Sequence, residues 1–321
     1  MYINFKLRVF LCDLRERKFR KIFFPQPLAP LREEIQENGT SKLKINNPFN
    51  APVYYKDTVT STMDEARLLA KEASGTVIAA DKQSAGRGRM GRSWMMNKGE
   101  NLSFTIMLRY GTISEIPLCL TLRAGLAVSG AIEDFTTFVS GVQDSPLKGR
   151  VFIKWPNDIM LPDKEGRGKK AAGILTEAEN GTVYLGIGVN LAQQSFPPEL
   201  ERKACSIAQV LLDMGIYNTT IAALLAEKRF LLLEMILARL YEEQDSAGDQ
   251  TWRQSREQLE ERLYMKDRQI CFIPGLPEEI SGEATADVIE GILQGIGEKG
   301  EILITAASGE TASFVTGELR I

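Results

Sequence analysis

Strand and helix patterns follow one another without strict alternation from residue 53 onward, and this irregular order most constrains the fold. Short apolar runs typical of strands occupy residues 53–57, 76–80, 102–108, 151–154, 172–177 and 183–189. A loop leads into a helical pattern at residues 58–73, with Ser61 and Thr62 as candidate N-caps, and further helical patterns cover 117–138 and 219–243. A doubly wound parallel sheet needs regular alternation, so this order predicts an α+β domain with a mixed sheet.

Residues 265–321 have a different texture. Strand candidates at 269–273, 286–296, 301–305 and 311–315 are separated by glycine-rich turns, and no helix pattern intervenes. Such a series favours a small β-barrel or sandwich module. We therefore predict two folded domains, one over residues 51–264 and a smaller one over residues 265–321.

The first 50 residues form a separate, basic region. They carry a net charge of +5, whereas the whole chain has a net charge of -3. A basic cluster, RERKFRK at residues 15–21, precedes Pro25, Pro27 and Pro30. Neither the apolar run of a signal peptide nor the two-helix pattern of a helix-turn-helix is present. We expect residues 1–50 to be a poorly ordered extension, with a nucleic-acid-binding arm as the alternative.

The chain has no histidine, and this removes whole classes of chemistry. Ser-His-Asp hydrolases, Cys-His proteases, HExxH metalloproteases and His-ligated metal sites are all excluded. The cysteines Cys12, Cys119, Cys205 and Cys271 lie far apart without a CxxC pair, which favours reduced thiols in a cytoplasmic protein. No run of about 18 apolar residues occurs, so no membrane span is predicted.

The most informative stretch is DKQSAGRGRMGRSW at residues 81–94, which combines three glycines with three arginines. Glycines let backbone amides approach a ligand closely, and guanidinium groups suit phosphate or carboxylate oxygens. The stretch predicts an anion-binding loop. It lacks the GK[ST] ending of a Walker A loop, and no helix pattern follows it as the dinucleotide fingerprint would require.

Three further motifs follow in the chain. KWPND at residues 154–158 offers an aromatic ring, an amide and a carboxylate directly after a strand. KAAGILTE at residues 170–177 places a lysine before a strand of small residues, where a cation can neutralise an anionic ligand. GIGVN at residues 186–190 puts two glycines inside a strand, which indicates the close approach of a ligand or another backbone.

Taken together and in this order, the four motifs resemble those of the biotin protein ligases, from about Tyr54 to the C-terminus. The resemblance implies a central domain related to class II aminoacyl-tRNA synthetases and an SH3-like C-terminal domain. It implies a two-step reaction, in which biotin and ATP give biotinyl-5′-AMP and the biotin then passes to a lysine of biotin carboxyl carrier protein, an acetyl-CoA carboxylase subunit. Two anionic reactants must be aligned, so such a site has to supply positive charge.

The resemblance also implies roles for individual residues. Lys170 and Arg89 would be catalytic. Biotin would be bound by Ser61, Thr62, Gln83, Arg87, Gly88, Arg89, Lys170, Gly173 and Gly188. The nucleotide would be bound by Arg92, Trp94, Asn157 and Asn190, and Asp158 would help to hold Mg²⁺.

This sequence departs from the family pattern in two places. Met63 follows Ser61 and Thr62 where the family often has asparagine, and residues 95–97 read MMN where a Ser-Pro turn is usual. Lys169 also competes for the role of Lys170, although Lys170 has the matching offset from Gly173.

Regarding its setting, the resemblance implies a monofunctional cytoplasmic ligase that binds no specific DNA and no membrane. A homodimer formed through an edge of the central sheet is compatible with it. The alternatives are a lipoate or octanoate ligase or transferase of the same fold, a biotin-sensing transcriptional regulator, and a non-catalytic binding module. The lack of histidine and the GRGRMGR sequence weigh against a lipoate or octanoate enzyme.

Overall fold

The computed structural model describes residues 34–35, 39–216, 220–245, 249–275 and 288–320. These residues all lie in one compact unit, Arg32–Ile321. The expected basic cluster and Cys12 fall outside the described residues.

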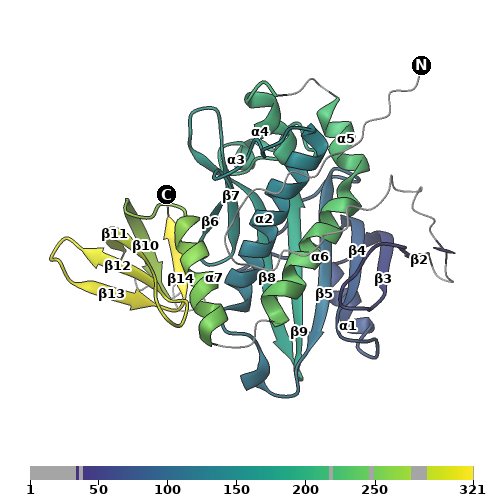
Figure 1. Cartoon of the computed structure of the whole chain (residues 1–321), viewed down its shortest axis with the longest axis horizontal. Helices are drawn as coiled ribbons and strands as arrows, with labels where there is room; N and C mark the ends of the chain where they lie inside the picture. The colour runs from purple at the N-terminus through teal and green to yellow at the C-terminus, as the bar shows by residue number, and fades with distance from the viewer. Residues whose placement is uncertain (1–33, 36–38, 217–219, 246–248, 276–287, 321) are drawn as a thin grey trace. The chain divides into compact units, whose positions relative to one another are not determined.

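A nine-stranded sheet forms the centre of this unit (Figure 1). In spatial order its strands are β1 (Glu34–Ile35), β2 (Thr40–Lys42), β3 (Val53–Val59), β4 (Thr76–Gln83), β5 (Asn101–Arg109), β9 (Thr182–Asn190), β8 (Gly168–Glu179), β7 (Asp158–Pro162) and β6 (Phe152–Lys154). Strands β3 and β4 are parallel, and the other neighbours are antiparallel. The mixed α+β sheet is thereby confirmed. Residues 34–35 and 40–42, expected in the poorly ordered extension, instead add two strands to its edge.

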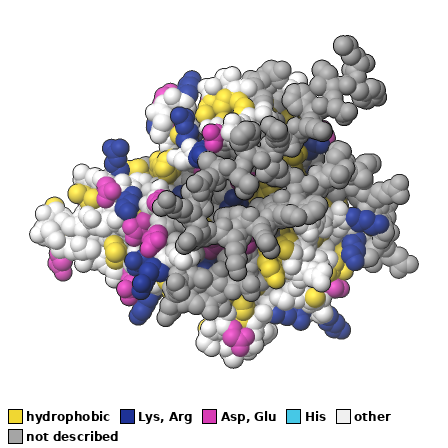
Figure 2. All heavy atoms as spheres, in the orientation of Figure 1, with side chains coloured by type: hydrophobic (Ala, Val, Ile, Leu, Met, Phe, Trp, Pro, Cys, Tyr) yellow, Lys and Arg dark blue, Asp and Glu magenta, His cyan; other side chains and the backbone are white. Residues whose placement is uncertain are grey.

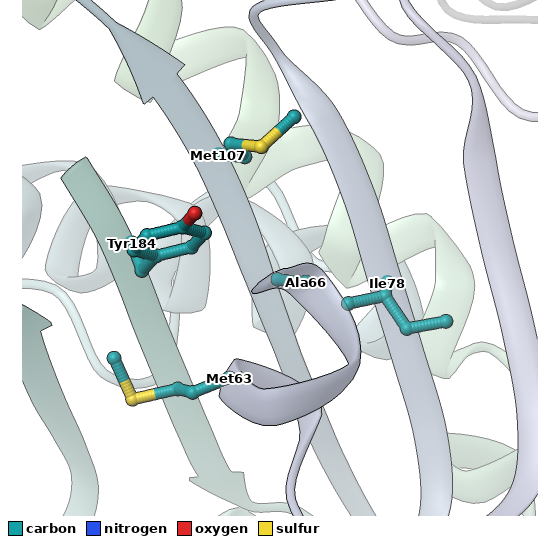
Figure 3. Packing of buried hydrophobic residues seen from close by; sticks show 5 residues of the cluster. All are labelled: Met63, Ala66, Ile78, Met107 and Tyr184. Carbon is teal, nitrogen blue, oxygen red and sulfur yellow. The ribbon is translucent and has the colours of Figure 1, made fainter. Parts of the chain in front are cut away.

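Helices cover both faces of this sheet. The helices among the described residues are α1 (Thr62–Leu68), the 3₁₀ helix η1 (Ile113–Glu115), α2 (Leu120–Ser140), α3 (Pro198–Glu201), α4 (Ile207–Asp213), α5 (Ile221–Glu227), α6 (Arg229–Asp245) and α7 (Asp249–Glu261). The long helices α2 and α6 run side by side across one face (Figure 1). Helix α1 lies on the opposite face, against β4, β5 and β9 (Figure 3).

Helix α1 begins where the sequence indicates but ends early. The hydroxyl of Ser61 accepts a hydrogen bond from the backbone N–H of Met63 at 3.3 Å, so Ser61 is the N-cap. The expected apolar stripe continued to Ala73, yet the helix ends at Leu68, whose side chain is 79% exposed. Because α1 starts only at Thr62, the part of the sheet beyond its N-terminal end is not covered by this helix.

The helix expected over residues 219–243 is wrong in one respect, because it is two helices. Within the described residues, α5 ends at Glu227, Lys228 forms a turn, and α6 starts at Arg229. The guanidinium of Arg229 lies 3.2 Å from the carboxylate of Asp81 on β4, so the break places a cation beside a buried acid.

The C-terminal region is a five-stranded antiparallel sheet, which confirms the expected small β domain. Its spatial order is β13 (Thr311–Phe314), β12 (Ile302–Ala306), β11 (Ile289–Ile296), β10 (Gln269–Pro274) and β14 (Gly317–Arg320). The indole N–H of Trp155 donates to the carbonyl of Gly300 at 3.0 Å, and its ring lies 6.0 Å from that of Phe272. The boundary after residue 264 stays a prediction.

The stretch Ile113–Ser140 is long and apolar enough to cross a membrane by length and composition alone. In the structure, however, 72% of its most apolar window is buried. Arg123, in the first turn of α2, is 2% exposed and donates to the backbone carbonyls of Leu118 and Glu243. This burial is typical of a core helix. Over the described part of the face in Figure 2, basic and acidic side chains are interspersed.

Candidate functional site

A row of small side chains crosses one face of the large sheet. Ala80 pairs with Ser103, Ser103 with Gly188, Gly188 with Gly173, and Gly173 with Asp158. Directly opposed residues of neighbouring strands project on the same face, so the row makes a trough from β4 to β7. Neighbouring strands lie about 4.8 Å apart, which gives roughly 14 Å between β5 and β7. Gly173 and Gly188 form the middle of this trough, and we call them the glycine floor.

The next row of the same face is filled by α1. It contains Thr105 and Gly186, and the sulfur of Met63 would lie 3.3 Å from a Cβ added at Gly186. Met63 packs with Ala66, Ile78, Met107 and Tyr184 in a buried cluster (Figure 3). The helix therefore covers this row and the one beyond it, and stops short of the glycine floor. Met63, the departure from the family pattern, serves this packing.

Trp94 lies on the glycine floor. A Cβ added at Gly188 would come within 2.6 Å of the indole Cζ2 and 2.7 Å of Nε1, and one at Gly173 within 3.2 Å of Cζ3. The ammonium of Lys170 lies 5.6 Å from the ring centroid. The indole Nε1 is buried and has no hydrogen-bond partner among the described residues. Trp94, which was expected to bind the nucleotide, thus lies over two glycines that were expected to bind biotin.

The glycine–arginine loop that carries Trp94 folds back on itself. The N–H of Gly88 donates to the carbonyl of Arg92 at 2.7 Å, and the N–H of Trp94 donates to the carbonyl of Gly86 at 2.8 Å. Gly91 forms the turn with a φ of 67°, a left-handed conformation that glycine adopts without strain. The loop is thus a short hairpin over the sheet.

The three arginines of this loop contact different parts of the chain. Arg87 lies 2.8 Å from Asp64 on α1 and 3.6 Å from Glu177 on β8. A second arginine, Arg89, donates to the amide oxygen of Asn157 at 3.1 Å. The third, Arg92, reaches Glu318 on β14 at 2.6 Å.

At one end of the cleft, three polar side chains form a hydrogen-bonded group. The amide oxygen of Gln83 accepts from the backbone N–H of Thr62 at 2.8 Å and from its hydroxyl at 3.2 Å. The hydroxyl of Thr105 donates to that of Thr62 at 2.9 Å. Ser61 lies beside them at the N-terminus of α1. The structure therefore brings together Ser61, Thr62 and Gln83, three of the residues expected to bind biotin.

Positive charge gathers at the other end. The Lys170 ammonium lies 2.6 Å from the Asp158 carboxylate. Burial lowers the pKa of Lys154 and of Arg89, and the charge of Asp158 opposes that lowering in both. These three cations surround one carboxylate, so the end of the trough has a net positive charge suited to an anion.

Most expected site residues line one cleft, whose empty space is about 450 Å³ including its opening to solvent. They are Ser61, Thr62, Gln83, Arg87, Gly88, Arg89, Trp94, Asn157, Lys170, Gly173 and Gly188. The lining does not include Arg92, Asp158 or Asn190. Arg92 pairs with Glu318, and Asp158 lies just below Lys170 at the trough end.

Asn190 is not brought into the cleft. Its side chain is buried, and its amide oxygen accepts from Asn101 at 3.2 Å and from Gln193 at 3.1 Å. Its amide N–H donates to the carbonyl of Lys170 at 3.3 Å. These bonds occupy Asn190 in fixing the backbone behind Lys170, whereas Asn157 lines the cleft beside Arg89.

A magnesium ion would find one protein carboxylate here. The described residues contain no group of three or more His, Cys, Asp or Glu side chains able to hold a metal. Asp158 Oδ1 is buried, and its ion pair with Lys170 does not have hydrogen-bond alignment, so it retains acceptor capacity. Mg²⁺ commonly uses one or two carboxylates together with substrate phosphates and water. Asp158 fits such a site only if the nucleotide supplies further ligands.

Sequence reasoning missed three residues of this region. Lys154 stands first in KWPND and was not assigned a role, although a cation in that motif was a usable signal. Glu318 comes from the C-terminal domain, and no local pattern links it to Arg92. Ser103 lines the cleft, and its hydroxyl has no partner among the described residues. It lies in an ordinary strand sequence, and no motif there indicates that this residue faces a ligand.

Comparisons with known proteins agree on the family. Residues 53–192 match the model of the Biotin/lipoate A/B protein ligase family. The bifunctional ligase/repressor BirA of Bacillus spizizenii is 41% identical over 168 residues, which are 48% of this chain and 46% of that protein. The biotin–[acetyl-CoA-carboxylase] ligase of Mycobacterium tuberculosis is 34% identical over 160 residues, which are 47% of this chain and 52% of that one. This chain thus spans about half the length of these curated relatives.

The fold comparison covers more of the chain. The biotin protein ligase from Aquifex aeolicus, solved in complex with biotin and ATP, superimposes with a TM-score of 0.60 at 25% identity. That alignment covers 84% of this chain and 97% of the Aquifex chain. The resemblance to the biotin/lipoate A/B protein ligase family thus lies in residues 53–192, which carry the glycine–arginine loop, the KWPND motif and the glycine floor.

Proposed function

We propose that this chain is a biotin protein ligase, which uses ATP to activate biotin and transfers it to a lysine of a biotin carboxyl carrier protein. The observation that carries the proposal is the order of groups along the trough. The hydrogen-bonded group of Thr62 and Gln83 lies at one end, the glycine floor in the middle and Lys170 at the other end. Biotin has the matching order of ureido ring, apolar tail and carboxylate.

Two anions must meet for the first step. A biotin carboxylate oxygen forms a bond to the α-phosphorus of ATP, the bond from that phosphorus to the bridging oxygen breaks, and pyrophosphate leaves. The cations Lys170, Arg89 and Lys154 offset the repulsion between carboxylate and phosphate and stabilise the charge that develops in the transition state. Asp158 holds the Lys170 ammonium at the end of the trough.

In the second step the acceptor lysine of the carrier protein attacks the carbonyl of the mixed anhydride. The amine loses a proton, an amide bond forms, and AMP leaves with the electrons of the broken C–O bond. The anhydride would hydrolyse in water, so the loop that carries Arg87 and Arg89 has to cover it. Arg87, held by Asp64 and Glu177, keeps this loop against α1 and β8.

Trp94 has two positions in this scheme. It rests on the glycine floor in the structure, and it must leave the floor before a biotin tail can lie there. Displaced from the floor, its indole becomes available to stack on the adenine, the role expected from the family resemblance. Asn157 and Arg92 complete the nucleotide side, while Asn190 acts through the backbone of Lys170.

When Mg²⁺ is bound with the nucleotide, it neutralises phosphate charge and aids the departure of pyrophosphate. Asp158 is the side chain that would help to hold it. The expected cytoplasmic location accords with Cys119, Cys205 and Cys271, all of which are free thiols in the described structure. The proposal also includes the client, a biotin-dependent carboxylase that carries the acceptor lysine, and a homodimer of this chain.

The two adjacent lysines give a matched test. Lys170→Gln should lower the rate of carrier-protein biotinylation by about 100-fold or more, because one cation aimed at the developing charge is lost. Lys169→Gln should change the rate less than about threefold, because the Lys169 ammonium bonds the carbonyl of Glu201 away from the cleft. The rate is measured as biotin incorporated into a purified carrier domain. Equal losses in both variants, or full activity of Lys170→Gln, would contradict the assignment.

A further inference from the structure

We propose that Ser103 is a specificity-determining residue of the cleft, and that its hydroxyl hydrogen-bonds the ureido ring of the bound ligand. This inference rests on the proposed function, because the cyclic urea is the head group of biotin. It adds a polar contact on β5 to the Thr62–Gln83 group at the N-terminus of α1.

The first observation is the state of the hydroxyl. Ser103 is 2% exposed, lines the cleft, and its Oγ is buried with no hydrogen-bond partner among the described residues. Its register neighbours, Ala80 on β4 and Gly188 on β9, have no polar side-chain atom. Buried hydroxyls in native proteins are nearly always hydrogen-bonded, so an unsatisfied one at a ligand cleft indicates a partner that arrives with the ligand.

The second observation is the contrast with Thr105, two residues along the same strand. Both side chains project on the same face of the sheet. The Thr105 hydroxyl is used within the protein, since it donates to Thr62 at 2.9 Å. Ser103 stands one row nearer the glycine floor, where α1 no longer covers the sheet. Of these two hydroxyls on β5, that of Thr105 is hydrogen-bonded within the protein, and that of Ser103 has no partner among the described residues.

The position of Ser103 in the trough identifies the ligand group. Lys170 fixes the carboxylate end at β7 and β8, so a ligand lying across Gly173 and Gly188 brings its ring to β5. The distance from β5 to β8 is two strand spacings, roughly 10 Å. A serine hydroxyl both donates and accepts, which suits the N–H and C=O groups of a cyclic urea. The ring sulfur of biotin is only a weak acceptor and is the poorer partner.

The test is Ser103→Ala, with biotin and desthiobiotin as ligands. Desthiobiotin keeps the ureido ring and lacks the sulfur. Isothermal titration should show that both dissociation constants rise by about 10-fold, because a ligand hydrogen bond is lost. The thermal midpoint of the ligand-free variant should stay the same or rise, since the removed hydroxyl has no partner in the ligand-free structure.

Ser129→Ala is the matched control. Ser129 is also buried, but its hydroxyl donates to the carbonyl of Gly125 at 2.7 Å within α2. That variant should keep both affinities. It separates the loss of a buried serine hydroxyl as such from the loss of one that faces the cleft.

Three outcomes would overturn the proposal. Unchanged affinity for both ligands would mean that Ser103 makes no ligand contact. A loss for biotin alone would assign the hydroxyl to the sulfur. A lowered midpoint of the ligand-free protein would make Ser103 a structural residue. Failure of the proposed function is distinguishable, because wild-type protein would then bind neither biotin nor desthiobiotin.

Discussion

Gly186 and Gly188 lie two residues apart on β9 and face the same side of the sheet, yet different kinds of segment cover them. Met63, from α1, lies over Gly186, and Trp94, from the glycine–arginine loop, lies over Gly188. One glycine of the G-x-G pattern, Gly186, therefore lies in the core, and the other, Gly188, lies in the cleft.

The difference lies in what holds each covering side chain. Met63 is 3% exposed, has no obligatory hydrogen bond, and packs among Ala66, Met107 and Tyr184. The indole of Trp94 has a buried N–H without a partner among the described residues, and exposed ion pairs such as that of Arg92 help to hold its loop. Met63, well packed on a helix, should therefore stay over Gly186. Trp94, on a loop and with an unsatisfied N–H, should be displaced from Gly188 when a ligand binds.

The largest expected difference comes from filling the two glycines. Gly188→Ala puts a methyl group on the floor of the trough, so biotin affinity should fall by about 100-fold, a loss of about 2.7 kcal/mol. Gly186→Ala meets the flexible end of Met63 at 3.3 Å, so it should cost about 1 kcal/mol of stability and change affinity less than about threefold. Titration calorimetry and urea unfolding measure both. An equal loss of biotin affinity in the two variants would contradict the assignment of Gly186 to the core and Gly188 to the cleft.

Removing the covering side chains should reverse the pattern. Met63→Ala should lower the free energy of unfolding by about 2–4 kcal/mol, because it leaves a cavity in the core. Trp94→Ala should lower it by less than about 1 kcal/mol, and without ATP it should tighten biotin binding by about fivefold, since no indole has to be displaced. Weaker biotin binding by Trp94→Ala would show that Trp94 is a ligand contact in the first step rather than a competitor.

The smallest effect concerns the clamp between Arg92 and Glu318. Burial alone would raise the pKa of Glu318, but the hydrogen bond and charge of Arg92, with the charge of Lys154, lower it below the ordinary glutamate value. A lowered pKa stabilises the fold above the ordinary pKa, and that stability is lost as pH falls through the lowered one. Because Arg92 is 61% exposed, the contribution should be at most about 0.5 kcal/mol.

Urea unfolding of wild type and Glu318→Gln across pH checks this. The difference in unfolding free energy should be present at neutral pH, decline below the ordinary glutamate pKa and vanish once the pH is below the lowered pKa of Glu318. A difference that does not change with pH would show that Glu318 acts by packing and not through its charge.

The sequence predicts only part of the structure around Gly186 and Gly188. The glycines of β9 and the arginines of the loop have local signatures, because close approach and anion binding each require particular residue types. The break at Lys228 has no such signature, since neither proline nor glycine marks it; it becomes intelligible only through the contact of Arg229 with Asp81. A local pattern therefore indicates which residues suit a turn or a ligand, whereas long-range contacts decide where a helix is interrupted.

The same limit applies to the polar site residues. Asn157 and Asn190 look equivalent in their motifs, yet Asn157 lines the cleft and Asn190 is occupied by Asn101 and Gln193. Ser103 has no motif at all. Whether a polar side chain is available to a ligand depends on partners brought from distant strands, and a single sequence does not contain that information in local form.

The most direct test of the whole account is exchange of labelled pyrophosphate into ATP, measured with biotin, with lipoate and with neither. Exchange should depend on biotin, because biotin and not lipoate offers both a ureido ring for the Thr62–Gln83 end and a carboxylate for Lys170. Exchange with lipoate and none with biotin would contradict the proposed function and indicate a lipoate ligase instead. Exchange with neither would contradict the adenylation step itself.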